Sequence, residues 1–210
     1  VSPCGYLFAE QMIGLYNNAG YTGLIITDHY HKGTVELPGS SWQETADHFL
    51  LGYRNAVEAG RKLDMDVLLG MELRFDTGSE DYLIYGFNEE FIYEHPYLNR
   101  YTLETFRELI KGTDIMIFQA HPFRPGMTPA NPALLDGVEA FNRNPRHNSH
   151  NDEAYGYGLS NNLLMLSGSD AHRTEDVGRS GILITERLHS IQEFVSLLRS
   201  GRPFKLFHME

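Results

Sequence analysis

Short apolar runs of strand length alternate with amphipathic segments of helix length along most of this chain. Such an alternation is typical of βα units built around a largely parallel sheet. Residues 24–26 and 115–118 are apolar without interruption, which suits strands covered on both faces. We expect strands at residues 23–27, 66–75, 82–87, 114–120, 137–141, 163–167, 181–185 and 203–207.

Four longer segments carry the apolar spacing of helices and are bounded by capping residues. Gly20 and Gly112 stand where a helix would end, whereas Thr102 and Ser190 stand where one would begin. We expect the stretch at 142–162, rich in Asn, His, Gly and Tyr, to be a long loop with one helical turn. The expected helices are 8–19, 41–63, 103–111 and 191–199. No repeat or linker divides the chain, so we expect one domain over residues 1–210.

Charge and cysteine content narrow the classes of partner. The 17 Lys and Arg residues against 28 Asp and Glu residues give a formal charge of -11, which opposes binding to nucleic acid polymers or anionic membranes. A small phosphorylated substrate remains compatible, because bound divalent cations reverse the local field. The single Cys4 rules out an internal disulfide, and we find neither a signal peptide nor a bilayer-spanning apolar run. We therefore expect a cytoplasmic protein, and the sequence does not indicate an oligomeric state.

Several of the expected strands end in a side chain that can bind a metal. In parallel α/β folds these ends share one face, so residues distant in sequence converge there. Carboxylates combined with imidazoles suit Zn, Mn or Fe, and the sequence does not choose among these metals. The candidate ligands are His29, Glu72, His121, Asp170 and His172.

Each of these residues also has a simpler interpretation. A single Asp or His at a strand end is more often a cap or a hydrogen-bonded loop residue than a ligand. Glu72 and His121 close apolar runs, where an unpaired polar group is costly and a shared metal would remove the cost. If the strand before Asp170 continues, Asp170 and His172 point to the same side. Glu139 ends a strand too, and we interpret it as a structural carboxylate.

The motifs that surround these residues resemble the PHP (polymerase and histidinol phosphatase) family over nearly the whole chain. They are Ser-Pro-Cys-Gly at 2–5, Gly-Tyr-Thr-Gly-Leu-Ile-Ile-Thr-Asp-His at 20–29, Gly-Met-Glu at 70–72, Ala-His-Pro at 120–122, Gly-Val-Glu-Ala-Phe-Asn at 137–142 and Gly-Ser-Asp-Ala-His at 168–172. The resemblance implies a distorted (β/α)7 barrel with metals at the strand ends. It also implies hydrolysis of a small phosphorylated metabolite or nucleotide.

The resemblance assigns roles to individual residues. Glu72 is similar to a carboxylate that bridges two metals, and the other four ligands complete a centre of two divalent cations, with three as the alternative. His31 is the candidate proton donor to the leaving oxygen. Arg124 and Arg173 follow ligand motifs and are candidates for phosphate binding, although either could instead pair with a surface carboxylate. Segments 30–42 and 142–162 are the expected determinants of substrate choice.

Three departures from the family pattern matter. The family opens with a strand carrying His-x-His, and this chain begins at Val1, so we expect a truncated start that lacks the first barrel strand. Cys4 stands where relatives often carry His or Asp, and a packed role is the simpler interpretation. Relatives often place a histidine ligand around 81–88, where Asp81 or Asn88 could substitute here.

Two rival functions remain open. A degenerate PHP module could bind a ligand or partner without catalysis, which the absent His-x-His would motivate. A hydrolase of C–N or C–O bonds uses similar strand-end ligands on a similar barrel, but no lysine stands at a strand end to serve as a carboxylated bridge.

Overall fold

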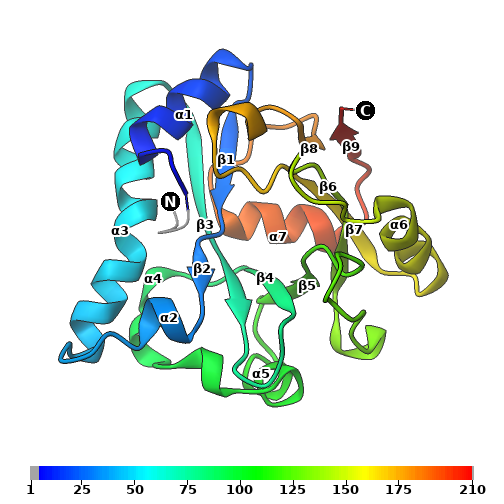
Figure 1. Cartoon of the computed structure of the whole chain (residues 1–210). Coiled ribbons are helices and arrows are strands. Elements are labelled where there is room, and N and C mark those ends of the chain that lie inside the picture. Colours follow the sequence, from blue (N-terminus) through cyan, green and yellow to red (C-terminus); the bar gives the residue numbers. More distant parts are fainter. Residues whose placement is uncertain (1–4, 210) are drawn as a thin grey trace.

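The computed structural model, which describes residues 5–209, shows a curled mixed sheet flanked by helices (Figure 1). Its strand order is β1-β3-β4-β5-β6-β7. Strand β2 also pairs with β3, at residues that follow those paired with β1. These strands are β1 (Gly23–Ile26), β2 (His29–Tyr30), β3 (Asp66–Arg74), β4 (Asp81–Tyr85), β5 (Met116–Gln119), β6 (Gly137–Asn142) and β7 (Leu164–Gly168). A separate antiparallel pair joins β8 (Ser180–Leu183) to β9 (Lys205–His208).

Seven α-helices and three short 3-10 turns connect these strands in the described part of the chain. They are α1 (Ala9–Asn18), α2 (Lys32–Val35), α3 (Trp42–Lys62), α4 (Glu89–Glu94), α5 (Leu103–Leu109), α6 (Asn151–Ser160) and α7 (Ile191–Arg199), with η1 (Leu98–Arg100), η2 (Pro132–Leu134) and η3 (Thr174–Asp176). None of the helices within 5–209 combines the length and apolarity needed to cross a bilayer.

The eight expected strands and four expected helices are all confirmed, with ends displaced by two residues or fewer. The sheet is less parallel than expected, because β4 runs antiparallel to both β3 and β5. The physical reason at β3 and β4 is the short connection at residues 75–80, which suits a hairpin and is too short for a parallel crossover. The remaining pairs, β1–β3, β2–β3, β5–β6 and β6–β7, are parallel.

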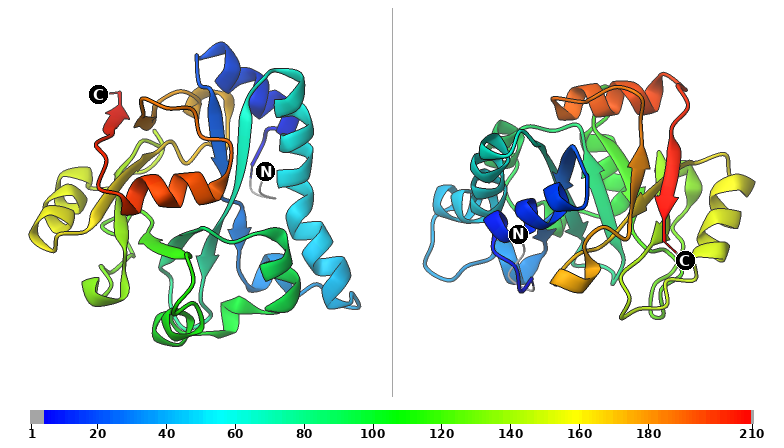
Figure 2. Two further views of the ribbon diagram at one scale, coloured as in Figure 1. Left: turned by 180° about the vertical axis from the view of Figure 1, so that it is seen from behind. Right: turned by 90° about the horizontal axis from the view of Figure 1, so that it is seen from above.

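The sheet is an open half-barrel in the described residues. β1 and β7 stand at the two ends of the strand order and do not pair with each other. The mixed α/β class is therefore confirmed, whereas a closed (β/α)7 barrel is not observed within 5–209. The view from above shows the curl of the sheet and the helices outside it (Figure 2).

Alternation along the central strands separates two apolar layers. Leu69, Met71 and Leu73 of β3 pack in a cluster with α3, α4 and α5, whereas Leu68 points to the opposite face. That opposite face packs against α7, whose Phe194 is 2% exposed. Both faces of the sheet are thus covered, as the uninterrupted apolar runs predicted.

The segment at 142–162 is the main local correction. It contains α6, a ten-residue helix, where the sequence predicted a loop with a single turn. Tertiary packing supports this helix despite its glycines, because a Cβ on Gly158 would lie 2.9 Å from the side chain of Met165 in β7. The helix can approach the sheet this closely only because residue 158 has no side chain.

Candidate metal centre

Strand register brings the first two candidate ligands together. His29 in β2 is the direct partner of Glu72 in β3, so both side chains lie on the same face of the sheet. The Nδ1 atom of His29 is 3.5 Å from Oε2 of Glu72, and Glu72 is only 7% exposed. Glu72 lies within β3 and not at its end, because the strand continues to Arg74.

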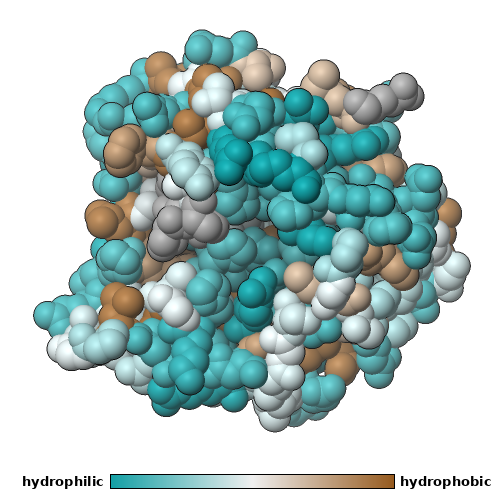
Figure 3. All heavy atoms as spheres, viewed as in Figure 1, coloured by the Kyte–Doolittle hydropathy of each residue, from teal (hydrophilic) through white to brown (hydrophobic). Residues whose placement is uncertain are grey.

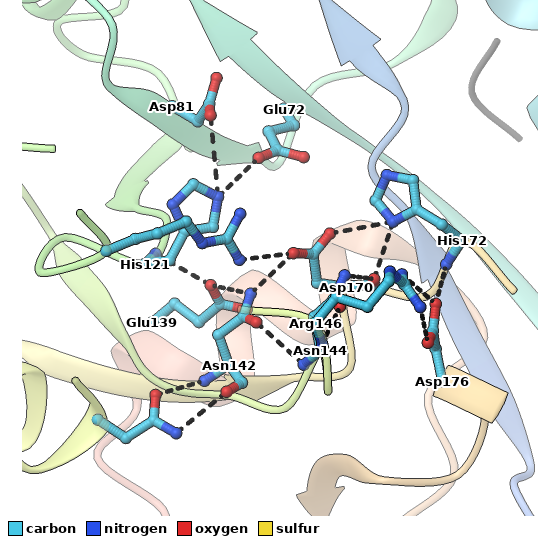
Figure 4. A network of polar contacts seen from close by, with 12 residues as sticks. Glu72, Asp81, His121, Glu139, Asn142, Asn144, Arg146, Asp170, His172 and Asp176 are labelled. Atoms are coloured by element: carbon cyan, nitrogen blue, oxygen red, sulfur yellow. Dashed lines mark hydrogen bonds and ion pairs between the residues drawn. The ribbon is translucent and has the colours of Figure 1, made fainter. Parts of the chain in front are cut away.

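His121 approaches the other oxygen of Glu72 from the end of β5. Its Nε2 atom is 3.2 Å from Glu72 Oε1 and 3.8 Å from Asp81 Oδ2 (Figure 4). Burial alone would lower the pKa of His121, but the hydrogen bond to Glu72 and the charge of Glu139 raise it above the usual value. The backbone of His121 has φ 29°, a left-handed conformation that a residue with a side chain rarely adopts.

Glu139 holds this strained turn. Its Oε2 atom accepts hydrogen bonds from the backbone N–H of His121 and from the side chain of Asn142, each at 3.0 Å. Burial raises the pKa of Glu139 to about 7, and the nearby Asp170 adds to the rise, although His121 opposes it. Glu139 thus supports the turn that carries His121, in agreement with the structural interpretation of this carboxylate.

Asp81 is the acidic residue that joins this group from β4. It pairs across the strands with Arg74, which donates two hydrogen bonds of 2.7 Å to its carboxylate. Donor atoms of His29, Glu72 and Asp81 lie within 4.8 Å of one another, as ligands of one metal ion would. Asn88, the other residue suggested for this position, instead caps α4 by accepting from the Phe91 N–H.

Asp170 and His172 form a second group beyond the end of β7. The strand ends at Gly168 and does not continue through them, so the condition for an extended spacing of the two side chains is not met. Asp170 has φ 48°, and this turn leaves its Oδ1 atom 3.4 Å from His172 Nδ1. Burial would raise the pKa of Asp170, but Arg124, which donates to its Oδ2 atom at 2.7 Å, holds that pKa below the usual range.

A buried ion pair fixes the turn that carries His172. Asp176 is fully buried and accepts hydrogen bonds of 2.8 Å from the backbone N–H groups of His172 and Arg173. Arg146 donates two further hydrogen bonds to the same carboxylate (Figure 4). The sequence predicted no role for Arg146 or Asp176, because 30 residues separate them and no motif spacing marks the pair.

His29 lies between the two groups. Its ring centroid is 6.1 Å from that of His172, and all five candidate ligands line one cavity of about 650 Å³. The five comprise three imidazoles and the carboxylates of Glu72 and Asp170, a donor set that suits divalent cations. Hydrophilic side chains gather across the centre of the face of the molecule that Figure 3 shows.

The other candidate residues have different settings. His31 caps α2, where its Nδ1 atom accepts from the Gly33 N–H, and its ring centroid is 5.8 Å from that of His29. Burial and the neighbouring His29 lower the pKa of His31. Arg173 stacks over the ring of Tyr6 at 4.8 Å. Cys4 lies outside the described residues.

Comparisons with known proteins agree with the resemblance seen in the sequence. Residues 148–203 match the PHP_C family model, described as PHP-associated. No curated protein sequence matches the chain significantly.

Three solved structures share the fold at low sequence identity. PsfC from Pseudomonas syringae PB-5123 has a TM-score of 0.66 and 18% identity, covering 88% of this chain and 78% of that protein. A two-domain protein from Bacteroides vulgatus ATCC 8482, which contains a predicted PHP-like metal-dependent phosphoesterase, has a TM-score of 0.63 and 16% identity. That match covers 99% of this chain but 63% of the other. An amidohydrolase from Chromobacterium violaceum, solved with bound sulfate and no metal, has a TM-score of 0.53 and 15% identity, with 94% of each chain covered.

The fold and the family match point to the same group of proteins. The match of residues 148–203 to the PHP-associated model, on a chain with the fold of a PHP-like protein, supports the resemblance to the PHP family seen in the sequence.

Proposed function

We propose that the chain is a metal-dependent hydrolase of phosphate esters in small metabolites or nucleotides. The observation that carries this proposal is the arrangement around Glu72, whose two carboxylate oxygens each face an imidazole, from His29 and His121. Without a cation, burying this carboxylate beside Asp81 would be costly. The PHP-associated match and the similar fold of a PHP-like phosphoesterase support the same class of chemistry.

We propose two divalent ions of Zn, Mn or Fe, held by His29, Glu72, His121, Asp170 and His172, with Asp81 as a further ligand. Such ions polarise phosphoryl oxygens and lower the pKa of a bound water. Asp176 and Glu139 then orient two of the proposed ligands, because they accept hydrogen bonds from the backbone of His172 and of His121. Outer partners of this kind commonly affect metal affinity about 10- to 100-fold.

Arg124 is the better placed of the two proposed phosphate-binding arginines. Its side chain is 15% exposed and donates to Asp170, so its guanidinium lies beside the proposed ligands. Arg173 is held over Tyr6 and is 43% exposed, which suits a residue at the rim. Proton donation by His31 remains a prediction; its lowered pKa favours the neutral imidazole at pH 7, in which Nε2 carries the proton.

A hydrolase of C–N bonds is the second candidate, favoured by the similar fold of the amidohydrolase from Chromobacterium violaceum. Within residues 5–209, no lysine lines the large cavity, so a carboxylated lysine bridge has no support there.

The test is turnover by the whole chain, first depleted with a chelator and then reloaded with Mn²⁺, Zn²⁺ or Fe²⁺. We expect metal-dependent release of phosphate from 4-nitrophenyl phosphate and no hydrolysis of a matched 4-nitroanilide. Hydrolysis of the anilide alone would favour the C–N hydrolase. Saturable metal binding with no turnover of either substrate would favour a binding module.

A further inference from the structure

A second, smaller cavity adjoins the candidate metal centre. It has a volume of about 190 Å³ and lies between the loop after β6, Arg179 before β8 and Met209 after β9. Asn142 lines both this cavity and the larger one, so the two share a wall. The same Asn142 donates to Asp170 Oδ2 at 3.3 Å on the side of the metal centre.

The charge of this small cavity is unusual for such an acidic protein. The chain has 13 arginines, and 11 of them lie within 4.0 Å of a carboxylate oxygen. Among the residues that the structure describes, the two without such a partner are Arg143 and Arg179. Both of them line the small cavity, and no acidic side chain from 5–209 lines it. Two cations without counter-charges leave a local positive field.

Two polar atoms in the lining residues are buried without a hydrogen-bond partner in the described structure. They are Nε of Arg143 and Oγ of Ser149, and Ser149 is only 3% exposed. Burying an unsatisfied donor costs free energy, so such atoms usually have a protein, water or ligand partner. The oxygen atoms of an anion would accept hydrogen bonds from both.

The walls of the small cavity are held in place by their own hydrogen bonds. Arg143 donates from Nη2 to Nδ1 of His208 at 2.9 Å, and the His208 ring stacks on Phe141 at 3.9 Å. The side chain of Asn151, at the start of α6, exchanges two hydrogen bonds of 3.0 Å with the backbone of Asn142. His208 is therefore half-buried and orients Arg143. The donors need little rearrangement to meet a ligand.

We propose that this cavity, the Arg143–Arg179 pocket, binds an anionic oxygen group such as a phosphate or a carboxylate. Two guanidinium groups and a hydroxyl provide donors in the manner typical of phosphate and carboxylate recognition. Because the pocket shares Asn142 with the metal centre, its anion is a second charged group of the substrate, distal to the bond that is hydrolysed. Only this assignment to the substrate rests on the proposed function; anion binding itself does not.

The first test measures binding without turnover. Inorganic phosphate is titrated into the chelator-treated whole chain and followed by calorimetry and ³¹P NMR. We expect saturable binding that weakens by about tenfold or more in the double variant Arg143→Gln/Arg179→Gln, because charge-assisted hydrogen bonds are lost. Ser149→Ala should weaken binding by a smaller factor. The control Arg61→Gln removes one positive charge at the exposed end of α3 and should leave the affinity unchanged.

Two results with the variants would overturn the proposal. One is phosphate binding by the double variant with the affinity of the parent chain. The other is a loss of binding in Arg124→Gln but not in the double variant, which would place the phosphate at the metal centre. If the double variant does not fold, Arg179→Gln alone serves, since the Arg179 side chain makes a single hydrogen bond within residues 5–209, from Nε to the Glu175 carbonyl. A parent chain that shows no saturable phosphate binding also contradicts the proposal.

The second test separates substrate from free anion. With the metal-loaded chain, KM is measured for alkanediol bisphosphates of graded length and for the matched alkyl monophosphates. If the anion belongs to the substrate, Arg179→Gln raises KM for a bisphosphate of suitable length and leaves KM for the monophosphate unchanged. If Arg179→Gln abolishes phosphate binding but changes neither KM, the pocket binds free phosphate.

Discussion

Glu72 joins two imidazoles of the candidate centre through its two carboxylate oxygens. Its Oε2 atom faces His29 Nδ1 at 3.5 Å, and its Oε1 atom faces His121 Nε2 at 3.2 Å. A carboxylate with an imidazole on each oxygen is well placed to join two cations. The neutral, isosteric glutamine would keep the shape of the site but lose that charge.

Glu72→Gln should lower the affinity for Mn²⁺ and Zn²⁺ by more than about tenfold, because a charged ligand is replaced by a weaker neutral one. Isothermal calorimetry on the chelator-treated chain measures this, with circular dichroism as the check on folding. The matched control is Glu58→Gln on the exposed surface of α3. Equal metal affinities in the parent and Glu72→Gln would remove Glu72 from the centre.

Two glycines offer a matched pair of alanine substitutions. A Cβ on Gly168 would lie 2.4 Å from Glu139 Oε1, so Gly168→Ala should destabilise the fold by about 1–3 kcal/mol. It should also weaken metal binding, since Glu139 holds the His121 turn. Gly14→Ala in α1 meets nothing within 4 Å and should stabilise by about 0.5–1 kcal/mol. Urea unfolding measures the free energy of unfolding of both variants. An unchanged value in Gly168→Ala would show that Glu139 can move freely.

At the residue scale, sequence patterns selected five candidate ligands that line the large cavity, because each stands in or shortly after an apolar run. Their binding of metal stays a prediction. Arg146 and Asp176 were not predictable in the same way. Their pairing depends on how the loop after β6 folds against the turn after β7, which no local pattern records. Asp81 was suggested as a substitute ligand, but its pairing with Arg74 follows from the β3–β4 register.

At the element scale, strands were easier to predict than their directions. Uninterrupted apolar runs mark buried strands in either direction, so they could not show that β4 runs antiparallel to β3 and β5. The helix α6 was missed because its Gly and Tyr content gives no helical apolar face, and its stability comes from contact with β6 and β7. The two-residue strand β2 is defined by pairing alone.

Helix α7 covers one face of the sheet, and its Phe194 side chain is only 2% exposed. Phe194→Ala should cost about 3–5 kcal/mol in the free energy of unfolding, because it removes a large side chain and leaves a cavity. Phe8→Ala, at a side chain that is 79% exposed, should change that free energy by less than about 0.5 kcal/mol. Similar costs for the two variants in urea would contradict the packing described for α7.

At the scale of the whole molecule, an acidic surface surrounds a centre rich in cation ligands and a small cavity with two arginines. The formal charge of -11 therefore describes the average surface and not the sites. The net charge opposes non-specific binding of polyanions, but composition could not place Arg143 and Arg179 in one cavity. That arrangement depends on the folded loop between β6 and α6.

Stability of the whole chain should depend on pH through Glu36, which links α2 to η1. Hydrogen bonds from Arg100 and Asn99 lower the pKa of Glu36 to about 2, below its value in an unfolded chain. Its stabilising contribution is therefore complete above pH of about 4.3 and is lost as the pH falls toward 2. Urea midpoints between pH 5 and pH 2 should fall less steeply in Glu36→Gln than in the parent or in the exposed control Glu90→Gln. Parallel pH profiles for all three chains would contradict this role.

The most direct test of the metal centre is anomalous X-ray diffraction at the Mn, Fe and Zn edges, using crystals of the whole chain grown with each metal. We expect an anomalous peak within bonding distance of Glu72 and His121, and a second peak near Asp170 and His172. Glu72→Gln crystals should lose or weaken the first peak. Crystals that bind metal elsewhere, with no anomalous peak beside Glu72 at any of the three edges, would contradict the central claim.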